Sequence, residues 1–192
     1  MNMPSPRPAT EADLAALWAL RTRAVRGGCA RHYPPEVIET WAAAPPPATM
    51  PLLLRAGGGI VMQAAGRLLG YAVMDAETGE VDAVFVDPAA HGQGVGRALL
   101  AALEAMARER DVEKLFLSAS LNAVAFYERA GFRALRERLY PHRSGIMIRA
   151  VLMEKRLTPS GCIAPCPPPS PSAAPAPAGR SRACPPAPAP SS

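Results

Sequence analysis

VFVDPAAHGQGVGRALLAALEAMARER, residues 84–110, holds the pattern of a strand, a glycine-rich turn and a helix in direct succession. The strand pattern spans residues 80–86 and is closed by Asp87-Pro88, because proline cannot extend a strand ladder. After Gly96 the apolar residues recur at helical spacing: Leu99, Leu100, Leu103 and Met106. The charged residues of this helix are expected on its other face: Arg97, Glu104 and Arg108. The stretch therefore predicts a strand that leads through a turn into a long helix.

The turn contains three alternating glycines, Gly92, Gly94 and Gly96. Glycine lets a ligand approach the backbone closely, and the first turn of a helix leaves its N–H groups without acceptors. Together with the positive end of the helix dipole, these donors favour an anion. We expect a ligand that carries phosphate, and a tight turn without any ligand is the alternative.

Two common phosphate-binding motifs are excluded at this turn. A P-loop needs Gly-Lys-Ser/Thr, but Gly96 is followed by Arg97-Ala98. A dinucleotide fingerprint that starts at Gly92 or Gly94 would need its third glycine where Arg97 or Leu99 stands. Nucleoside triphosphate hydrolysis and Rossmann-type binding are therefore not expected.

The run His91-Gly92-Gln93-Gly94-Val95-Gly96 resembles the acetyl-CoA loop of the GNAT superfamily of N-acetyltransferases. That signature reads Arg/Gln-x-x-Gly-x-Gly/Ala and opens a helix after a strand. His91 stands here in place of arginine or glutamine. Because main-chain N–H groups make many of the contacts to the cofactor in that family, the resemblance still implies acetyl-CoA as cosubstrate.

A second stretch, SASLNAVAFYERAGF at residues 118–132, resembles the second motif of the same family. In that motif an asparagine precedes a helix that carries Phe-Tyr and ends in Gly-Phe. Asn122 is expected as an N-cap, residues 123–129 as a short helix and Gly131 as its left-handed end. A plain cap and a core tyrosine are the alternatives without a ligand, but the two motifs together favour the family.

The resemblance covers residues 7–157 and implies an α/β GNAT fold. In that fold a twisted, mixed sheet of six to seven strands is flanked by helices on both faces, and its central strands splay apart around the cofactor. Periodicity predicts helices at residues 11–26, 34–41, 50–56 and 123–129, and a long helix from Gly96 on. It predicts strands at residues 60–64, 68–75, 80–86, 114–117, 133–140 and 146–156.

Length and composition favour one folded domain followed by a tail. The chain has 192 residues, of which 49% are hydrophobic, enough for one substantial core at residues 1–157. Residues 158–192 are mostly Pro, Ala and Ser and are expected to be disordered. Three cysteines of this tail, Cys162, Cys166 and Cys184, have no ligand partners at zinc spacing, so no metal is expected.

Charge and hydropathy narrow the partners. The net charge of +5 is distributed among acidic residues and forms no basic block, so no nucleic-acid partner is expected. There is no run of 18 uncharged apolar residues, and the first ten residues have no apolar core. We therefore expect a cytoplasmic protein without a membrane partner, and a homodimer stays open.

The residues expected to contact acetyl-CoA follow from the resemblance. They are Phe85, Val86, His91, Gly92, Gln93, Gly94, Val95, Gly96, Arg97, Asn122, Phe126 and Tyr127. An oxyanion would meet a backbone N–H near Val86, where a bulge commonly interrupts this strand in the family. Tyr127 matches the position of a phenol that protonates the departing thiolate.

A base is also needed, because an amine with a pKa of about 10.4 is protonated at neutral pH. Glu80 and Asp82 alternate with Val84 and Val86 along the strand, so either carboxylate could face the acetyl group. Some family members place a glutamate near the position of Glu80. Both residues could equally be solvated at the start of the strand.

The acceptor site is expected at the first helices and before the last strand, where family members shape this pocket. Its candidates are His32, Tyr33, Tyr140 and His142, with surface packing as the alternative. His32 or His142 as the base is an open hypothesis. Cys29 is expected to be a small, semi-buried side chain rather than a nucleophile.

The resemblance implies an N-acetyltransferase in which an amine attacks acetyl-CoA directly within a ternary complex. The segment ARHYPPEVIETW, residues 30–41, is similar to bacterial members thought to act on small molecules. Two alternatives stay open: an enzyme that acetylates an α-amino group or a lysine of a protein, and a non-catalytic sensor that binds acetyl-CoA.

Overall fold

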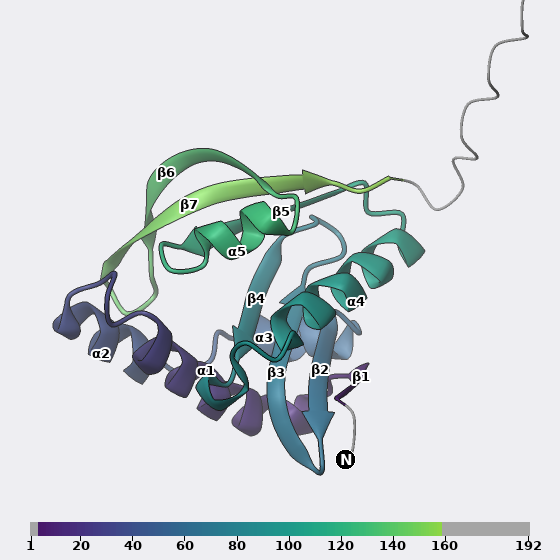
Figure 1. The fold of residues 1–192 in the computed structure, drawn as a ribbon, viewed down its shortest axis with the longest axis horizontal. Coiled ribbons are helices and arrows are strands. Elements are labelled where there is room, and N and C mark those ends of the chain that lie inside the picture. Colours follow the sequence, from purple (N-terminus) through teal and green to yellow (C-terminus); the bar gives the residue numbers. More distant parts are fainter. Residues whose placement is uncertain (1–3, 159–192) are drawn as a thin grey trace, which may run out of the picture. The chain divides into compact units, whose positions relative to one another are not determined.

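The computed structural model describes residues 4–158, which form seven strands and five α-helices (Figure 1). The strands are β1 (Ser5–Pro8), β2 (Gly59–Ala64), β3 (Arg67–Met74), β4 (Val81–Val86), β5 (Lys114–Ser120), β6 (Arg133–Pro141) and β7 (Met147–Arg156). The helices are α1 (Leu14–Gly28), α2 (Pro35–Ala43), α3 (Thr49–Arg55), α4 (Val95–Glu109) and α5 (Val124–Arg129). Two 3₁₀ turns, η1 (Glu11–Asp13) and η2 (Pro88–Ala90), precede α1 and the glycine turn.

The strands form two antiparallel sheets that diverge from a single point. One sheet has the order β1-β2-β3-β4 and the other the order β5-β7-β6. Between β4 and β5 the described residues pair only at a parallel bridge between Glu80 and Phe116, where the Phe116 N–H donates to the Gly79 carbonyl. Beyond that bridge the two strands separate, as Figure 1 shows. The predicted splay between central strands is confirmed.

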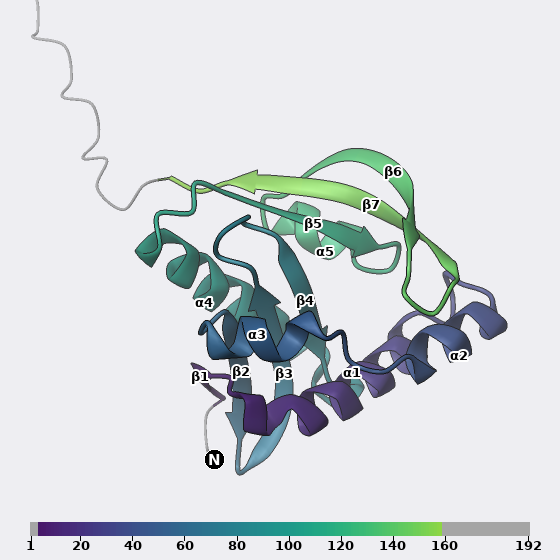
Figure 2. The same cartoon turned by 180° about the vertical axis from the view of Figure 1, so that it is seen from behind.

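Helices cover both faces of the four-stranded sheet. On one face α1 and α3 pack Leu17, Leu20 and Met50 against the sheet (Figure 2). On the other face α4 packs Leu99 and Leu103, both fully buried, against apolar side chains of β2 and β3. Each buried leucine stabilises the fold by about 1.5–3 kcal/mol. This layered α/β arrangement confirms the predicted fold.

β1 was not predicted from the sequence. Its residues, Ser-Pro-Arg-Pro, pair in antiparallel register with β2 at the edge of the sheet. The two prolines lack an N–H donor, so the segment does not carry a strand pattern. An edge strand tolerates them because one side of its ladder needs no partner.

Two other predictions about this framework are wrong. Glu104, expected on the exposed face of α4, is buried and accepts hydrogen bonds from Lys155 (2.5 Å) and Arg108 (3.2 Å). The bulge expected near Val86 lies at Asp82, because Val73 pairs with Ala83 while Met74 pairs with Val81. Asp82 is thus the extra residue of β4.

The predicted tail and its three cysteines lie outside the described residues, apart from Thr158. No helix within residues 4–158 has the length and apolar character needed to cross a bilayer. The same residues contain no cluster of three His, Cys, Asp or Glu side chains arranged around a metal site.

Candidate active site

The glycine turn forms the entrance to α4. Gly92 and Gly94 have φ angles of +75° and +77°, in the left-handed region that favours glycine, and Gly94 is the N-cap of α4. A Cβ placed on either residue would meet no protein atom within 4 Å. The space above the loop is therefore open to a ligand.

The backbone donors of this turn are largely free. Within residues 4–158 the N–H groups of Gly94, Val95, Gly96 and Arg97 have no backbone acceptor, and the first helical bond runs from Ala98 to the Gly94 carbonyl (3.0 Å). These donors coincide with the positive end of the α4 dipole. The turn can therefore receive an anion.

The turn is held to α1 by an ion pair. Asp87 accepts the Ala89 N–H (3.0 Å) at η2 and pairs with Arg23 (2.7 Å) from α1. The Arg23 guanidinium holds the pKa of the Asp87 carboxyl below its usual range. This contact fixes where β4 ends and the turn begins.

A cleft of about 1130 Å³ runs from the glycine turn through the gap between β4 and β5 to α1 and α2. It is lined by nearly all residues predicted to contact the cofactor: Phe85, Val86, His91, Gly92, Gly94, Val95, Gly96, Arg97, Asn122, Phe126 and Tyr127. Gln93 is the exception, because its side chain donates to the Ala89 carbonyl (3.0 Å) outside the cleft. Two distant motifs of the sequence therefore meet at one opening.

The backbone of β4 also presents donors to the gap. Asp87 donates its N–H to Leu69 on β3, and the antiparallel register from there places Phe85 and Ala83 at hydrogen-bonded positions. Val84 and Val86 alternate with them, so their N–H groups point away from β3 toward β5. No acceptor on β5 meets them in the described residues.

Asp82 lies on the bulge of β4 and lines the cleft together with Glu80. The Asp82 side chain is exposed to solvent. Desolvation and the neighbouring carboxylates of Glu80 and Asp75 raise the pKa of Asp82 to about 6. Asp82 is therefore ionised at neutral pH yet close to its titration point, as a general base should be.

Tyr127 projects from α5 into a buried aromatic cluster. Its ring meets those of Phe126 and Phe132 edge to face, at centroid distances of 5.1 and 5.5 Å. Its hydroxyl makes no hydrogen bond within residues 4–158, and the residue lines the cleft. Burial raises the pKa of Tyr127 above its usual value, so the phenol keeps its proton at neutral pH.

Asn122 is not the predicted N-cap. The cap of α5 is Ala123, and no side chain bonds to the helix there. Instead, the Asn122 side-chain oxygen accepts a hydrogen bond from the Cys29 thiol at 3.5 Å. Burial raises the pKa of Cys29 to about 11, so Cys29 is a thiol at neutral pH and not a nucleophile.

Of the four predicted acceptor residues, Tyr140 and His142 line the cleft, whereas His32 and Tyr33 do not. His32 is exposed. Tyr33 is buried and uses its hydroxyl to bridge main-chain groups: it donates to the Arg149 carbonyl (2.7 Å) and accepts the Leu121 N–H (2.8 Å). Tyr33 therefore joins the segment after α1 to β7 and to the end of β5, two neighbouring strands of the three-stranded sheet.

His142 is a poor candidate for the base. Burial, with the positive charges of Arg143 and Arg21, lowers the pKa of His142 to about 4. The imidazole is therefore neutral at physiological pH and resists protonation. Asp82, whose raised pKa of about 6 still leaves it ionised at neutral pH, is the better candidate of the two.

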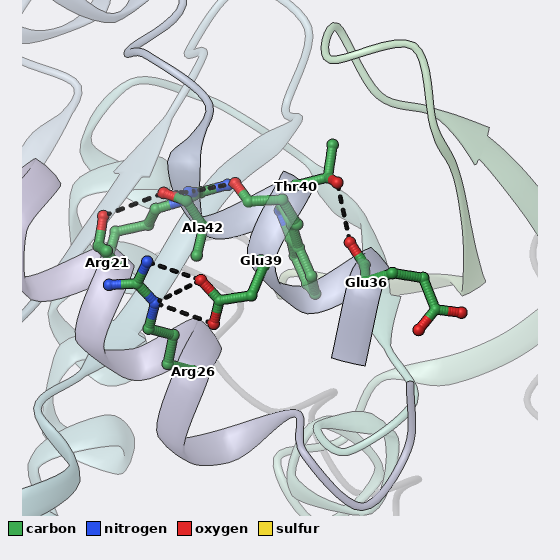
Figure 3. Close-up of polar contacts among 8 residues, drawn as sticks. Arg21, Arg26, Glu36, Glu39, Thr40 and Ala42 are labelled. Carbon is green, nitrogen blue, oxygen red and sulfur yellow. Dashed lines mark hydrogen bonds and ion pairs between the residues drawn. The ribbon is translucent and has the colours of Figure 1, made fainter. Parts of the chain in front are cut away.

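The structure adds residues at the acceptor end that the sequence interpretation missed: Trp18, Arg21, Tyr71 and Arg143. Arg21 lies on the buried face of α1, where it donates to the carbonyls of Trp41 (2.7 Å) and Ala42 (3.2 Å) on α2 (Figure 3). A signal was present, since Arg21 occupies an apolar-face position between Trp18 and Val25. A charged residue in such a stripe has to be held by specific partners.

Comparisons with known proteins agree with this geometry. A family model described as an acetyltransferase (GNAT) domain matches residues 29–157. A structure of a GCN5-related N-acetyltransferase from Rhodopseudomonas palustris superposes with a TM-score of 0.71 at 27% identity, over 82% of this chain and 98% of that one.

Two curated relatives match shorter segments. Glucosamine 6-phosphate N-acetyltransferase of Trypanosoma brucei brucei is 33% identical over 81 residues, which cover 38% of this chain and 55% of that protein. Mycothiol acetyltransferase of Salinispora tropica is 39% identical over 84 residues, which cover 38% of this chain and 27% of that protein. The chain thus spans about half and about a quarter of these relatives. Because the family model itself matches more than half of the chain, the protein belongs to the GNAT acetyltransferase family.

Proposed function

We propose that this enzyme transfers the acetyl group of acetyl-CoA to an amine of a small molecule by direct attack within a ternary complex. One observation carries the proposal: the free N–H groups of the glycine turn, the free N–H groups of β4, Asp82 and Tyr127 all face one continuous cleft. Acetyl-CoA supplies a reactive thioester and a negatively charged pyrophosphate. The groups along the β4 gap fit the thioester, and the glycine turn fits the pyrophosphate.

The glycine turn is proposed to hold the pyrophosphate of acetyl-CoA. The N–H groups of Gly94, Val95, Gly96 and Arg97 are the donors, and the open space above Gly92 and Gly94 admits the phosphate oxygens. His91 and Arg97 are exposed beside the turn and can add side-chain contacts. Phe126 and Asn122 border the same part of the cleft.

Asp82 is proposed to take the proton from the attacking amine, directly or through water. Its pKa of about 6 leaves it ionised at pH 7, while an alkylammonium with a pKa of about 10.4 must lose a proton before it can attack. Glu80 raises the pKa of Asp82 through its charge and so tunes the base.

Two negative charges form during the reaction, one on the acetyl oxygen and one on the departing sulfur. Val86 is proposed to stabilise the first and Tyr127 the second. The N–H of Val86, which points into the gap, donates to the acetyl carbonyl oxygen as that oxygen becomes negative. The Tyr127 hydroxyl, which burial keeps protonated, donates its proton to the departing thiolate. The nitrogen–carbon bond forms and the carbon–sulfur bond breaks, which releases CoA.

The choice of a small-molecule acceptor is supported by the names of the two curated relatives, each of which contains a small molecule, glucosamine 6-phosphate or mycothiol. A protein acceptor would be supported instead if peptides with free α-amino groups or lysines were acetylated faster than any small amine. A sensor would bind acetyl-CoA but release no CoA with any amine.

The test is calorimetry of the full chain with acetyl-CoA, CoA and ATP, followed by CoA release with a panel of small amines and peptides. We expect saturable binding of acetyl-CoA and CoA but not of ATP, and CoA release with at least one small amine. If none of the three ligands binds, the turn is only a turn and the proposal is wrong.

A further inference from the structure

We propose that the acceptor amine carries a carboxylate or phosphate group, and that Arg21, Arg143 and Tyr71 bind it at the end of the cleft near α1 and α2. We call these three residues the anion pocket. The inference rests on the proposed function and names the class of its acceptor. It is carried by two guanidinium groups that have no carboxylate partner and one hydroxyl that has no hydrogen-bond partner among residues 4–158.

Arg21 is a buried cation without a carboxylate partner. Its residue is 2% exposed, and among residues 4–158 no Asp or Glu oxygen lies within 4 Å of its guanidinium. One nitrogen, Nη1, donates to the two carbonyls of α2, and Nε and Nη2 have no protein acceptor in the same region. A buried charge is costly unless it is paired.

The neighbouring arginines of α1 show the contrast. Arg26, one turn further along, forms bonds of 2.8–3.2 Å with both carboxylate oxygens of Glu39 (Figure 3). Arg23 pairs with Asp87. Two arginines of α1 therefore have a carboxylate partner, from α2 and from the end of β4, and Arg21 has none within the described residues.

Arg143 brings a second unpaired cation to the same place. It lies in the turn between β6 and β7, and its guanidinium stands 5.1 Å from the Trp18 ring, while that of Arg21 stands 4.6 Å from it. Within the described chain no carboxylate pairs with Arg143. Burial, with a smaller contribution from the charge of Arg143, lowers the pKa of Arg21 to about 10, and His142 is neutral at physiological pH.

Tyr71 contributes an unused hydroxyl. The residue is 0% exposed, and its hydroxyl has no hydrogen-bond partner among residues 4–158. It lines the cleft, as Arg21 does, and packs in the same side-chain cluster as Trp18, whose ring centroid lies 4.6 Å from the Arg21 guanidinium. Leaving a buried hydroxyl without a hydrogen-bond partner costs about 1–3 kcal/mol. An anionic oxygen that accepts a hydrogen bond from the Tyr71 hydroxyl would remove that penalty.

The cleft is therefore polarised along its length. Asp82 and Glu80 line it on β4, and the anion pocket lies where α1, α2 and the β6–β7 turn meet. An acceptor that carries an amine and a carboxylate or phosphate complements this arrangement, because its amine can lie near the carboxylates of β4 and its anionic group can lie in the anion pocket. A bidentate guanidinium contact also selects planar carboxylates and phosphates over neutral groups.

The experiment compares matched acceptors: glucosamine 6-phosphate against glucosamine, and an amino acid against its amide. We expect kcat/KM for CoA release to be at least about tenfold higher for the anionic member of one pair, and which pair responds distinguishes phosphate from carboxylate. Equal kcat/KM within both pairs overturns the inference while leaving the proposed function intact.

The variants Tyr71→Phe and Arg143→Gln remove binding groups without removing a hydrogen bond of the fold. Each is expected to raise KM for the anionic acceptor about tenfold or more and to leave KM for acetyl-CoA unchanged. Arg26→Gln, which removes an exposed arginine of α1 that does not line the cleft, is the matched control and should leave both KM values unchanged. If all three variants behave alike, the anion pocket is wrong.

A second measurement does not depend on catalysis. Trp18 and Trp41, the two tryptophans of the chain, both lie within 6 Å of the Arg21 guanidinium. Titration with inorganic phosphate or with acetate should, for at least one of the two anions, change tryptophan fluorescence saturably in the wild-type protein and weakly or not at all in Arg143→Gln. If no amine is acetylated, the proposed function fails and these titrations still decide the site, because the absence of a saturable change with both anions overturns it.

Discussion

Asp82 owes its chemistry to one extra residue in a strand. At the bulge Asp82 has no partner on β3, and it lines the cleft beside Glu80. Folding raises the pKa of Asp82, which means that ionising it weakens the fold as the pH rises through about 6. This residue is therefore kept at a cost in stability, as expected of a functional group.

Asp82→Asn should lower kcat/KM for acetyl transfer by about 10²–10⁴-fold at pH 7, because the variant cannot accept the proton of the amine. In the wild type, activity should fall as the pH drops through about 6, where Asp82 becomes protonated. The pH–rate profile of the variant should lack this limb.

Glu80→Gln is the matched control for that profile. It removes a like charge that raises the pKa of Asp82, so the acidic limb should move to lower pH while activity above pH 7 is kept. A limb that stays in place in both variants would contradict the assignment of Asp82 as base.

Tyr127→Phe should lower kcat, because the departing thiolate loses its proton donor, and should leave acetyl-CoA affinity nearly intact. The fold should tolerate the change, since within residues 4–158 the hydroxyl makes no hydrogen bond that would be lost. Steady-state kinetics and calorimetry test the two parts. A kcat within twofold of wild type would remove Tyr127 from the mechanism.

At the scale of elements, a substitution in the glycine turn can act in two ways, by straining the backbone or by blocking the ligand. Gly94→Ala forces a side chain into left-handed backbone, at a cost of about 1–2 kcal/mol, and places its Cβ in the open space above the turn. We expect acetyl-CoA affinity to fall at least about tenfold by calorimetry.

Gly66→Ala provides the comparison. Gly66 has a φ of +72° in the turn between β2 and β3 and also meets no protein atom within 4 Å, but it does not line the cleft. It should lose similar stability and keep full affinity. Equal affinity losses in the two variants would mean that strain, not the phosphate site, explains the effect.

Elements with strong periodicity could be predicted from the sequence. The leucine spacing of α4 and the glycines before it predicted the helix and its N-terminal turn, because both signals are local. The capping role of Asn122 could not be predicted correctly, since its side chain bonds instead to Cys29. That contact joins residues 93 positions apart, and no local rule of helix capping contains it.

The acceptor end was the least predictable part of the site. His32 and Tyr33 have suitable side chains, but whether a residue after α1 faces the cleft depends on how α2 packs against α1 and the β6–β7 turn. Arg21 showed the opposite problem, because its position on an apolar face predicted burial without saying what it would meet. Long-range packing decides both.

At the scale of the whole molecule, Lys155 connects three elements. Its amine, on β7, donates to Glu104 on α4 (2.5 Å) and to the Ala130 carbonyl at the end of α5 (2.7 Å). Lys155→Met leaves the buried Glu104 with Arg108 alone, so the free energy of unfolding should fall by roughly 2 kcal/mol in urea denaturation.

Arg149→Met tests whether burial of the ion pair is the reason for the loss of stability expected in Lys155→Met. Arg149 pairs with Glu137 on the adjacent strand at 3.1 Å, but both side chains are well exposed. Such pairs contribute about 0–1 kcal/mol, so this variant should change the unfolding free energy little. If Arg149→Met destabilised the protein as much as Lys155→Met, the buried contact would not be special.

The gap between β4 and β5 leaves the two sheets joined in the described chain by little backbone bonding beyond the bridge at Glu80. Amide hydrogens that point into this gap have no carbonyl to protect them, so those of Val84 and Val86 should exchange rapidly with deuterium in the free enzyme. Bound acetyl-CoA should slow them, whereas the amides of Ala83 and Phe85, bonded to β3, should be slow throughout. The cosubstrate would then supply the hydrogen-bond partners that β4 lacks in the gap. The folded state would be most stable when acetyl-CoA is bound.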